Sequence, residues 1–197
     1  MERNRIERAP TLGARLQKCA DFVREGKKLA DIGTDHGYVP VCLLQSGKIP
    51  FAVAVDVHKG PLESAMNNAS RCGVADKMHF VCGDGLHGVL PDEAEDIVIA
   101  GMGGELIARL LEKCPWVKNG VNLVLQPMTK WDVLRKWLYD NGFEVKKELA
   151  CTEGLFAYSV MQAVYTGKTP SYECDDRYLQ FGFVKPCLLY TSDAADD

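Results

Sequence analysis

Three carboxylates in this sequence lie close to the ends of short apolar runs that are typical of buried strands. Asp31 opens the motif DIGTDHG, Asp56 lies near the end of the run FAVAVDV, and Asp84 lies in the motif CGDGL. The carboxyl ends of successive parallel strands form one ligand-binding edge in an open α/β sheet, so we expect these side chains to contact one ligand. Because carboxylates accept hydrogen bonds and repel phosphates, that ligand should have hydroxyl groups or positive charge.

The glycine-containing turn at residues 31–37 distinguishes between two kinds of nucleotide ligand. A dinucleotide-binding fold would have the pattern GxGxxG, in which the second glycine lets a pyrophosphate approach the backbone. Here Gly33 and Gly37 are present, but Asp35 stands in place of the second glycine. Its carboxylate would repel a pyrophosphate and attract the amino and sulfonium groups of S-adenosylmethionine. An ordinary strand-to-helix turn is the alternative interpretation.

Asp56 and Asp84 suit the adenosine part of the same ligand. A carboxylate at the end of a second strand, about 20 residues after the glycine turn, accepts hydrogen bonds from ribose hydroxyls. Asp84 is placed to accept a hydrogen bond from the exocyclic amine of adenine. Each carboxylate alone is also compatible with a surface residue or the cap of a turn. Their shared edge of the predicted sheet is what favours ligand binding.

Two further motifs are candidates for holding an acceptor base. Residues 100–104 read AGMGG, and the missing side chains would let a flat base lie against the backbone beside the methyl donor. After the next apolar run, the amide of Gln126 is suited to reading a base edge, and Pro127 would stiffen the turn. A flexible glycine loop and an ordinary loop before a helix are the respective alternatives.

The candidate site therefore consists of residues from five turns that follow predicted strands. The expected cofactor contacts are Asp31, Gly33, Thr34, Asp35, His36, Gly37, Asp56, Val57, Gly83, Asp84, Gly85, Ala100, Gly101, Met102 and Gly103. The expected acceptor contacts in these turns are Gly103, Gly104, Gln126 and Pro127. The four histidines and eight cysteines show no metal-ligand spacing, so we expect no metal ion.

The N-terminal segment is a candidate contact for nucleic acid. The formal net charge is −4, yet residues 1–28 have eight basic side chains and four acidic ones. We expect Arg8, Arg15 and Lys18 to contact the phosphates of a substrate. A solvated helix face is an equally good explanation of the same charges.

The elements that must position these motifs alternate between strand and helix patterns. Near-continuous apolar runs, typical of parallel strands covered on both faces, occur at residues 29–33, 51–57, 78–82, 96–100 and 121–125. Helical spacing occurs at residues 12–22, 39–45, 61–72, 105–113 and from a cap at Thr129 to Asn141. Strand patterns at residues 143–150 and 157–165 have no long helix between them and should pair antiparallel. The predicted fold class is α/β: a Rossmann-like class I methyltransferase with a seven-stranded, mostly parallel sheet and helices on both faces.

Length and composition indicate one cytoplasmic catalytic domain. The chain has 197 residues, of which 25% are charged, and this is long enough to bury one core. No apolar run would span a bilayer, and the first residues, MERNRIERAP, lack the apolar segment of a secretory signal. Since the cysteines form no CxxC pair, we expect reduced thiols in a cytoplasmic protein.

Together the motifs resemble those of one family, the bacterial tRNA (adenine-22-N1)-methyltransferases, from about residue 12 to residue 184. The matching stretches are RLQKCADFV, LADIGTDHGYVP, the glycine-proline of HKGPLESA, CGDGL, IAGMGGELIARLL and LQP. DIGTDHGY combined with IAGMGG is specific to this family, because the generic fold has GxGxG in the first motif. The resemblance implies methyl transfer from S-adenosylmethionine to N1 of adenine 22 in tRNA, with S-adenosylhomocysteine as the other product.

The resemblance also implies a helical coiled-coil domain after the catalytic domain. We therefore assign residues 1–166 to the catalytic domain and residues 167–184 to the start of a truncated helical region. Residues 185–197 continue no earlier pattern and resemble translated sequencing-adaptor read-through, so we expect them to be a non-native tail. We expect the chain to be a monomer.

Asp35 is the candidate catalytic residue. A ring nitrogen already has a lone pair, so the enzyme must chiefly align it with the methyl group. The methylated ring becomes cationic, and a neighbouring carboxylate would stabilise that charge. The alternatives are a methyltransferase of the same fold that acts on a small molecule, and a catalytically silent module that binds S-adenosylmethionine and RNA. A nicotinamide-dependent dehydrogenase is disfavoured by Asp35 itself.

Overall fold

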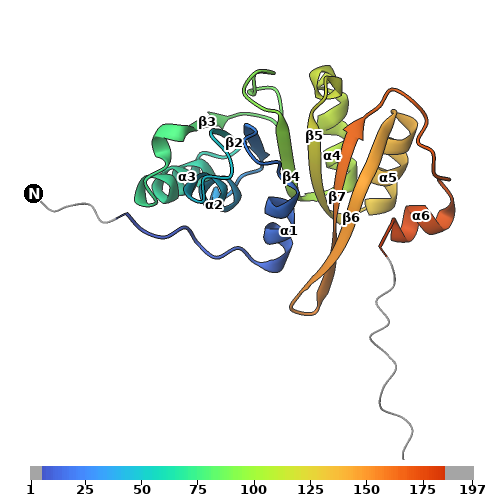
Figure 1. The fold of residues 1–197 in the computed structure, drawn as a ribbon, viewed down its shortest axis with the longest axis horizontal. Coiled ribbons are helices and arrows are strands. Elements are labelled where there is room, and N and C mark those ends of the chain that lie inside the picture. Colours follow the sequence, from blue (N-terminus) through green and yellow to red (C-terminus); the bar gives the residue numbers. More distant parts are fainter. Residues whose placement is uncertain (1–5, 185–197) are drawn as a thin grey trace, which may run out of the picture.

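The computed structural model describes residues 6–184, which form one seven-stranded sheet in the order β3-β2-β1-β4-β5-β7-β6. The first five strands are parallel, and β7 is antiparallel to both of its neighbours (Figure 1). The strands are β1 (Leu29–Ile32), β2 (Ala52–Asp56), β3 (Met78–Cys82), β4 (Asp96–Gly103), β5 (Asn122–Thr129), β6 (Phe143–Glu153) and β7 (Phe156–Tyr165). The predicted sheet and its antiparallel ending are confirmed. The predicted tail at residues 185–197 lies outside the described residues.

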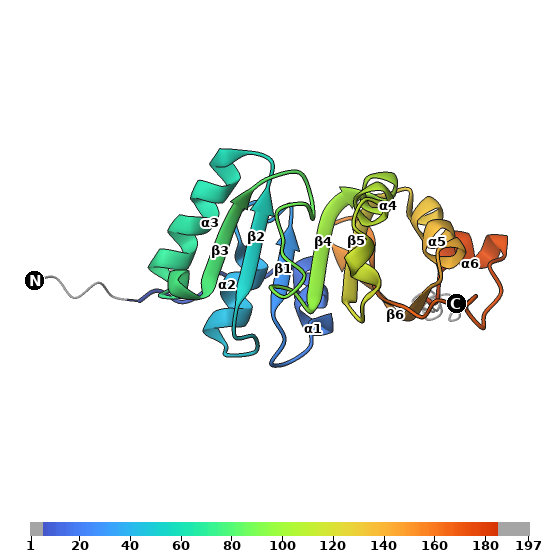
Figure 2. The same cartoon turned by 90° about the horizontal axis from the view of Figure 1, so that it is seen from above.

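Helices cover both faces of the sheet (Figures 1 and 2). One face packs against α1 (Ala14–Phe22), α2 (Tyr38–Gln45) and α3 (Lys59–Arg71). The other face packs against α4 (Gly104–Glu112) and α5 (Trp131–Asp140), and α6 (Asp176–Phe181) lies against α5. Two short 3-10 helices, η1 (Ala75–Lys77) and η2 (Pro115–Lys118), precede β3 and β5.

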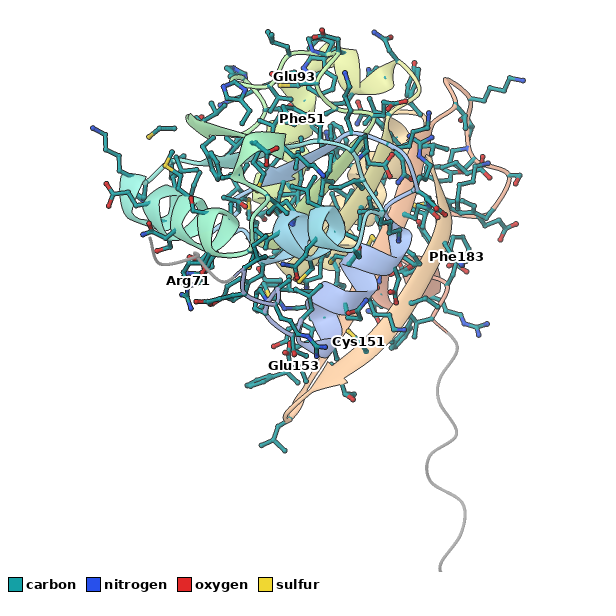
Figure 3. The ribbon with its side chains drawn as sticks, turned by 60° about the vertical axis from the view of Figure 1, so that its left-hand side comes forward. Phe51, Arg71, Glu93, Cys151, Glu153 and Phe183 are labelled. Atoms are coloured by element: carbon teal, nitrogen blue, oxygen red, sulfur yellow. The ribbon has the colours of Figure 1, made fainter. Side chains whose placement is uncertain are left out.

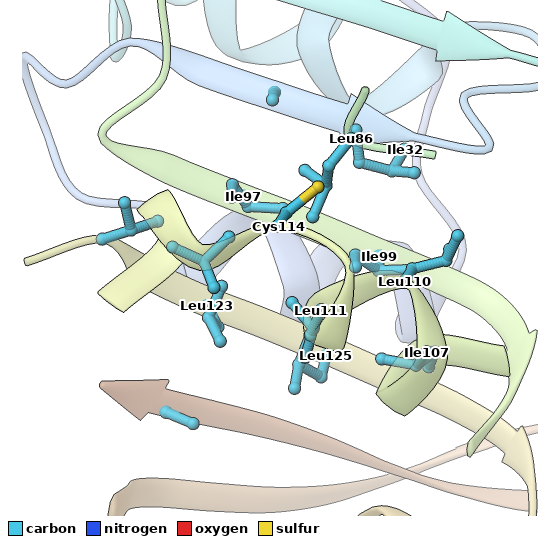
Figure 4. Close-up of a cluster of buried hydrophobic side chains, with 14 of the residues drawn as sticks. Ile32, Leu86, Ile97, Ile99, Ile107, Leu110, Leu111, Cys114, Leu123 and Leu125 are labelled. Atoms are coloured by element: carbon cyan, nitrogen blue, oxygen red, sulfur yellow. The ribbon is translucent and has the colours of Figure 1, made fainter. Parts of the chain in front are cut away.

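The strands β2, β1, β4 and β5 lie inside the sheet because they are apolar on both faces. All four residues of β1 and the first four of β2 are buried. On one face Ile32, Ile97 and Ile99 pack in one cluster with Ile107 and Leu111 of α4 (Figure 4). Each such buried side chain contributes about 1.5–3 kcal/mol. This packing holds the strands in register, so that their carboxyl ends meet at one edge.

A buried carboxylate at the opposite, amino edge has a structural role. Asp96 is fully buried, and its Oδ1 accepts a 2.7 Å hydrogen bond from Nε of Arg24. Its Oδ2 accepts hydrogen bonds from the backbone N of Arg24 (2.7 Å) and from Nδ2 of Asn122 (2.8 Å). A buried charge is tolerated only when it is paired and hydrogen-bonded in this way. Asp96 therefore joins the segment after α1 to β4 and β5.

β4 and β5 extend further than predicted. β4 ends at Gly103 and β5 at Thr129, and these two residues pair with each other. The glycine segment after the fourth apolar run therefore continues β4 beside β5, with register shifts on either side of Met102. Thr129 was predicted to cap α5. This prediction is wrong, because Thr129 belongs to that strand pair. The N-cap is Lys130, in a left-handed conformation with φ of 55° and no side-chain cap hydrogen bond.

Part of residues 167–184 folds back onto the sheet and α5. Arg135 of α5 and Glu148 of β6 form a buried ion pair in which Nη2 and Oε1 are 2.6 Å apart. Nη1 of Arg135 donates a 2.7 Å hydrogen bond to the carbonyl of Leu179 in α6. Oε2 of Glu148 accepts one of 3.0 Å from the backbone N of Phe183. The predicted start of a helical region is thus attached to the catalytic domain, and the proposed boundary stays a prediction.

Within residues 6–184, no helix is long and apolar enough to cross a membrane. The same part of the chain contains no group of three His, Cys, Asp or Glu residues placed to hold a metal ion. Its seven cysteines are free, and Cys19, Cys72 and Cys114 are buried. Cys82 is exposed, and Cys42, Cys151 and Cys174 are partly buried.

Candidate functional site

Two hollows adjoin at the carboxyl edge of the sheet. The larger, of about 470 Å³, is lined by Arg15, Leu16, Asp31, Gly33, Thr34, Asp35, His36, Tyr38, Val39, Ala100, Gly101 and Met128. The smaller, of about 120 Å³, is lined by Ile32, Gly33, Val55, Asp56, Val57, Gly83, Asp84, Gly85, Met102, Leu106 and Leu110. Gly33 belongs to both. The structure thus brings together all the residues expected to contact a cofactor except Gly37, which is the N-cap of α2, and Gly103.

The turn between β1 and α2 forms the floor where the hollows meet. Gly33 has φ of 72°, and a Cβ at this position would overlap Cε of Met102. Asp31 is buried and accepts a 2.6 Å hydrogen bond from Oγ1 of Thr34. Burial raises the pKa of Asp31 to about 6, the Thr34 hydrogen bond opposes that rise, and the nearby Asp56 charge adds to it. A carboxylate in this position favours a cationic partner.

Asp35 occupies the tip of the same turn in a left-handed conformation with φ of 49°. This conformation costs a non-glycine residue about 1–2 kcal/mol, because its Cβ crowds the following carbonyl. The side chain is exposed, and its Oδ2 lies 3.7 Å from Nε2 of His36, whose ring stacks on Tyr38. Backbone strain of this kind occurs preferentially at functional sites. The turn thereby places a carboxylate in the wall of the larger hollow.

The smaller hollow combines two carboxylates with an apolar wall. Asp56 ends β2, and its Oδ1 accepts a 2.9 Å hydrogen bond from the backbone N of His58, which orients the carboxylate. Oδ2 of Asp84 lies 3.8 Å from Nζ of Lys113. Val57 contributes an exposed apolar side chain to the same hollow. Such a slot suits a nucleoside, because the base packs on apolar groups while its hydroxyl and amino groups reach the carboxylates.

Gln126 has a different role from the one predicted. Its side chain is fully buried, and Oε1 accepts hydrogen bonds from Nη1 of Arg15 (2.7 Å) and the backbone N of Gly101 (3.0 Å). Its Nε2 donates to the carbonyl of Pro127 (2.9 Å), which is itself buried in β5. With both amide atoms bonded inside the protein, Gln126 positions the backbone of β4 and a guanidinium. It does not present an amide to a base edge, and Pro127 does not form an exposed turn.

The glycines of residues 101–104 divide into two groups. Gly101 is exposed, has φ of 82° and lines the larger hollow. Gly103 instead faces Oγ1 of Thr129, and Gly104 is buried against the carbonyl of Lys130. The prediction that Gly104 contacts the acceptor is therefore corrected, because Gly104 is buried, whereas the contact of Gly103 with a ligand stays a prediction. Both glycines allow the start of α4 to approach the end of β5 and the start of α5.

Gly104→Ala should destabilise the fold. The added Cβ would overlap the carbonyl oxygen of Lys130, a backbone atom that cannot move unless α5 shifts. We expect the free energy of unfolding to fall by about 1–3 kcal/mol, as in other overpacked sites, measured by urea denaturation. Gly60→Ala in α3 is the matched control, because open space surrounds Gly60, and it should be as stable as the parent. Equal stability of the two variants would contradict this explanation of Gly104.

Arg15 is the basic N-terminal residue that reaches the larger hollow. Its guanidinium lies 5.8 Å from the centre of the Tyr158 ring, and its Nε is 3.8 Å from Oε2 of Glu153. Lys18 pairs with an aspartate of its own helix, and Arg8 is exposed. From the sequence, Arg8, Arg15 and Lys18 were all predicted to contact phosphates of the substrate. The position of Arg15 depends on β6 and β7 lying alongside α1, and helical spacing alone contains no signal of that.

Comparison with known proteins agrees with this geometry. Residues 12–161 match the sequence profile of a family described as a methyltransferase domain. The tRNA (adenine(22)-N(1))-methyltransferase of Bacillus subtilis (strain 168) is 34% identical over 163 residues, which are 82% of this chain and 68% of that protein. The chain belongs to this family of tRNA methyltransferases.

Solved structures of the family share the fold. A putative tRNA (m1A22) methyltransferase of Streptococcus pneumoniae, in complex with S-adenosyl-L-methionine, is 34% identical with a TM-score of 0.81, covering 88% of this chain and 80% of that chain. TrmK of M. capricolum, in complex with S-adenosyl-homocysteine, is 25% identical with a TM-score of 0.78, covering 88% and 76%. The family resemblance and the Rossmann-like class I fold predicted from the sequence are both confirmed.

Proposed function

We propose that this protein transfers a methyl group from S-adenosylmethionine to N1 of adenine 22 in tRNA. The observation that supports this best is the pair of hollows that meet at Gly33. One suits a nucleoside, and the other places Asp31 and Asp35 beside the exposed backbone of Gly101. The curated relative from Bacillus subtilis is named for the same nucleotide. The proposed partner is tRNA, and the proposed setting is the cytoplasm, with the chain acting as a monomer.

The residues of the site fit S-adenosylmethionine. Gly33 lines both hollows and has no side chain, so a ligand that extends from one hollow to the other would pass over its backbone. Asp31 would hold the amino group, since a buried carboxylate with a raised pKa gains most from a cation. Asp56 would accept the ribose hydroxyls, and Val57 would pack on the adenine. When bound, S-adenosylmethionine supplies an electrophilic methyl group.

The chain's own residues align the acceptor and stabilise the charge that develops on it. Adenine N1 has a free lone pair only when the base is unpaired, and flipping it out costs a few kcal/mol. The backbone at Gly101, held by Gln126, offers a surface without a side chain on which a flat ring can rest. As N1 forms its new bond to carbon the ring becomes cationic, and the carboxylate of Asp35 would stabilise it.

Cofactor affinity should increase as the pH rises through about 6. Asp31 has a pKa of about 6, so it is mostly protonated at pH 5 and cannot pair with the amino group of the cofactor. We therefore expect S-adenosylmethionine to bind about tenfold more weakly at pH 5 than at pH 7, measured by isothermal titration. Asp31→Asn should bind weakly at both pH values with no such change. A parent chain whose affinity is the same at pH 5 and pH 7 would rule out this role for Asp31.

Methyl transfer to tRNA transcripts tests the proposed function directly. Unmodified transcripts with adenine or guanine at position 22 are incubated with the protein and radiolabelled S-adenosylmethionine. Label on the adenine transcript alone is the expected result. Label on both would overturn the position, and label on neither, with the cofactor bound, would overturn tRNA as the acceptor. Transfer to free adenine nucleosides but not to tRNA would support a small-molecule methyltransferase instead.

A further inference from the structure

The β6–β7 hairpin exposes apolar side chains at the same edge of the sheet as the site. β6 is parallel to β1–β5, so its carboxyl end and the start of β7 lie at the edge where the other strands end. The hairpin extends past the rest of the sheet (Figure 1). Next to its turn, Leu155 is 100% exposed and Phe156 is 69% exposed. Large apolar side chains this exposed are costly in water, so a partner that covers them would be favoured.

One face of the hairpin is turned toward α1. Glu153 pairs with Phe156 and Cys151 pairs with Tyr158 in the antiparallel ladder, so these four side chains share a face. Arg15 of α1 lies over the Tyr158 ring and within 3.8 Å of Glu153. Figure 3 shows Cys151 and Glu153 on the hairpin beside α1. Phe156 therefore lies on the face that Arg15 contacts, two residue pairs closer to the turn than Tyr158.

This face is continuous with the larger hollow. Arg15 lines the hollow, and its Nη1 is bound to Gln126, which holds the backbone of β4. Met128 also lines the hollow. Arg15 is also the residue whose guanidinium lies over the Tyr158 ring of the hairpin. An acceptor base in the hollow would thus have its neighbouring nucleotides beside the hairpin.

We propose that Phe156 and Tyr158, with the guanidinium of Arg15, form a stacking surface for the unpaired nucleotides next to the methylated base. Unpaired bases stack on aromatic rings and on arginine planes, and this contact is tolerant of sequence. Lys18 of α1 and Lys147 of β6, whose Nζ lies 5.5 Å from the ring of Phe22, add positive charge beside this face for the phosphates. The inference rests on the proposed function, because it takes the acceptor to be part of an RNA strand.

Phe156→Ala tests the stacking surface. We expect the KM for tRNA to rise about tenfold or more, with kcat at saturating tRNA and the Kd for S-adenosylmethionine unchanged. Phe156→Tyr, which keeps an aromatic ring, should restore the parent KM. Leu90→Ala removes an equally prominent apolar side chain from the loop before β4, away from the hairpin, and should behave as the parent.

The outcomes separate this inference from the function on which it rests. An active parent with an unchanged KM in Phe156→Ala overturns the stacking surface and leaves the proposed function intact. A parent that methylates neither transcript overturns the proposed function and this inference together.

Discussion

Replacing Asp35 with asparagine should lower kcat for methyl transfer by about 100-fold or more, the usual effect of removing one electrostatic contact to a developing charge. Asparagine has nearly the same shape as aspartate and tolerates the left-handed backbone that Asp35 adopts, with φ of 49°. The substitution therefore removes the negative charge and leaves the turn in place. Single-turnover methylation of unmodified tRNA measures the effect without contributions from product release.

A matched carboxylate elsewhere controls for the loss of charge. Asp76 in η1 is exposed and lies outside both hollows, so Asp76→Asn should methylate tRNA at the parent rate. The Kd for S-adenosylmethionine separates the two roles considered for Asp35. A slower rate with unchanged cofactor affinity supports stabilisation of the methylated ring. Weaker cofactor binding with an unchanged rate at saturation would make Asp35 a cofactor ligand only, and parent values for both would exclude it from the site.

Arg135→Met should have the largest effect on stability. The side chains of Arg135 and Glu148 are both buried and their ion pair is 2.6 Å long, so the substitution leaves an uncompensated carboxylate inside the domain. We expect the free energy of unfolding to fall by about 3–5 kcal/mol. The hydrogen bond from Arg135 to the carbonyl of Leu179 is lost as well, so α6 should detach from α5. Urea denaturation measures the first effect, and limited proteolysis at Arg177 in α6 measures the second.

Two companion variants show whether the uncompensated charge is the cause. Adding Glu148→Gln to Arg135→Met should recover part of the lost stability, because the buried carboxylate is then neutral. Lys136→Met, at the next position of α5, removes an exposed charge paired with Asp140. Its free energy of unfolding should equal that of the parent. If the double variant were less stable than Arg135→Met, the loss would come from packing around the methionine and not from the charge of Glu148.

The alternation of strands and helices could be predicted from the sequence because it depends on local periodicity. Near-continuous apolar runs mark parallel strands wherever helices cover both faces, and β1, β2 and β4 satisfy this. The sequence also predicted that four carboxylates would lie at one site: Asp31, Asp35, Asp56 and Asp84. This was possible because the carboxyl ends of parallel strands meet at one edge whatever the details of packing. A family resemblance spanning most of the chain added the proposed reaction.

Only the tertiary structure shows the roles of Gln126, Arg15, Gly104 and Thr129. Arg15 and Gln126 are 111 residues apart in sequence, and no local pattern records that α1 lies across the carboxyl end of β5. Gly104 is glycine because the backbone of Lys130 approaches it, which the motif AGMGG alone could not distinguish from a binding turn. Thr129 looked like a helix cap because threonine suits caps and strands alike. Local sequence specifies which conformation a segment prefers, whereas packing between distant segments decides which polar atoms remain available to a ligand.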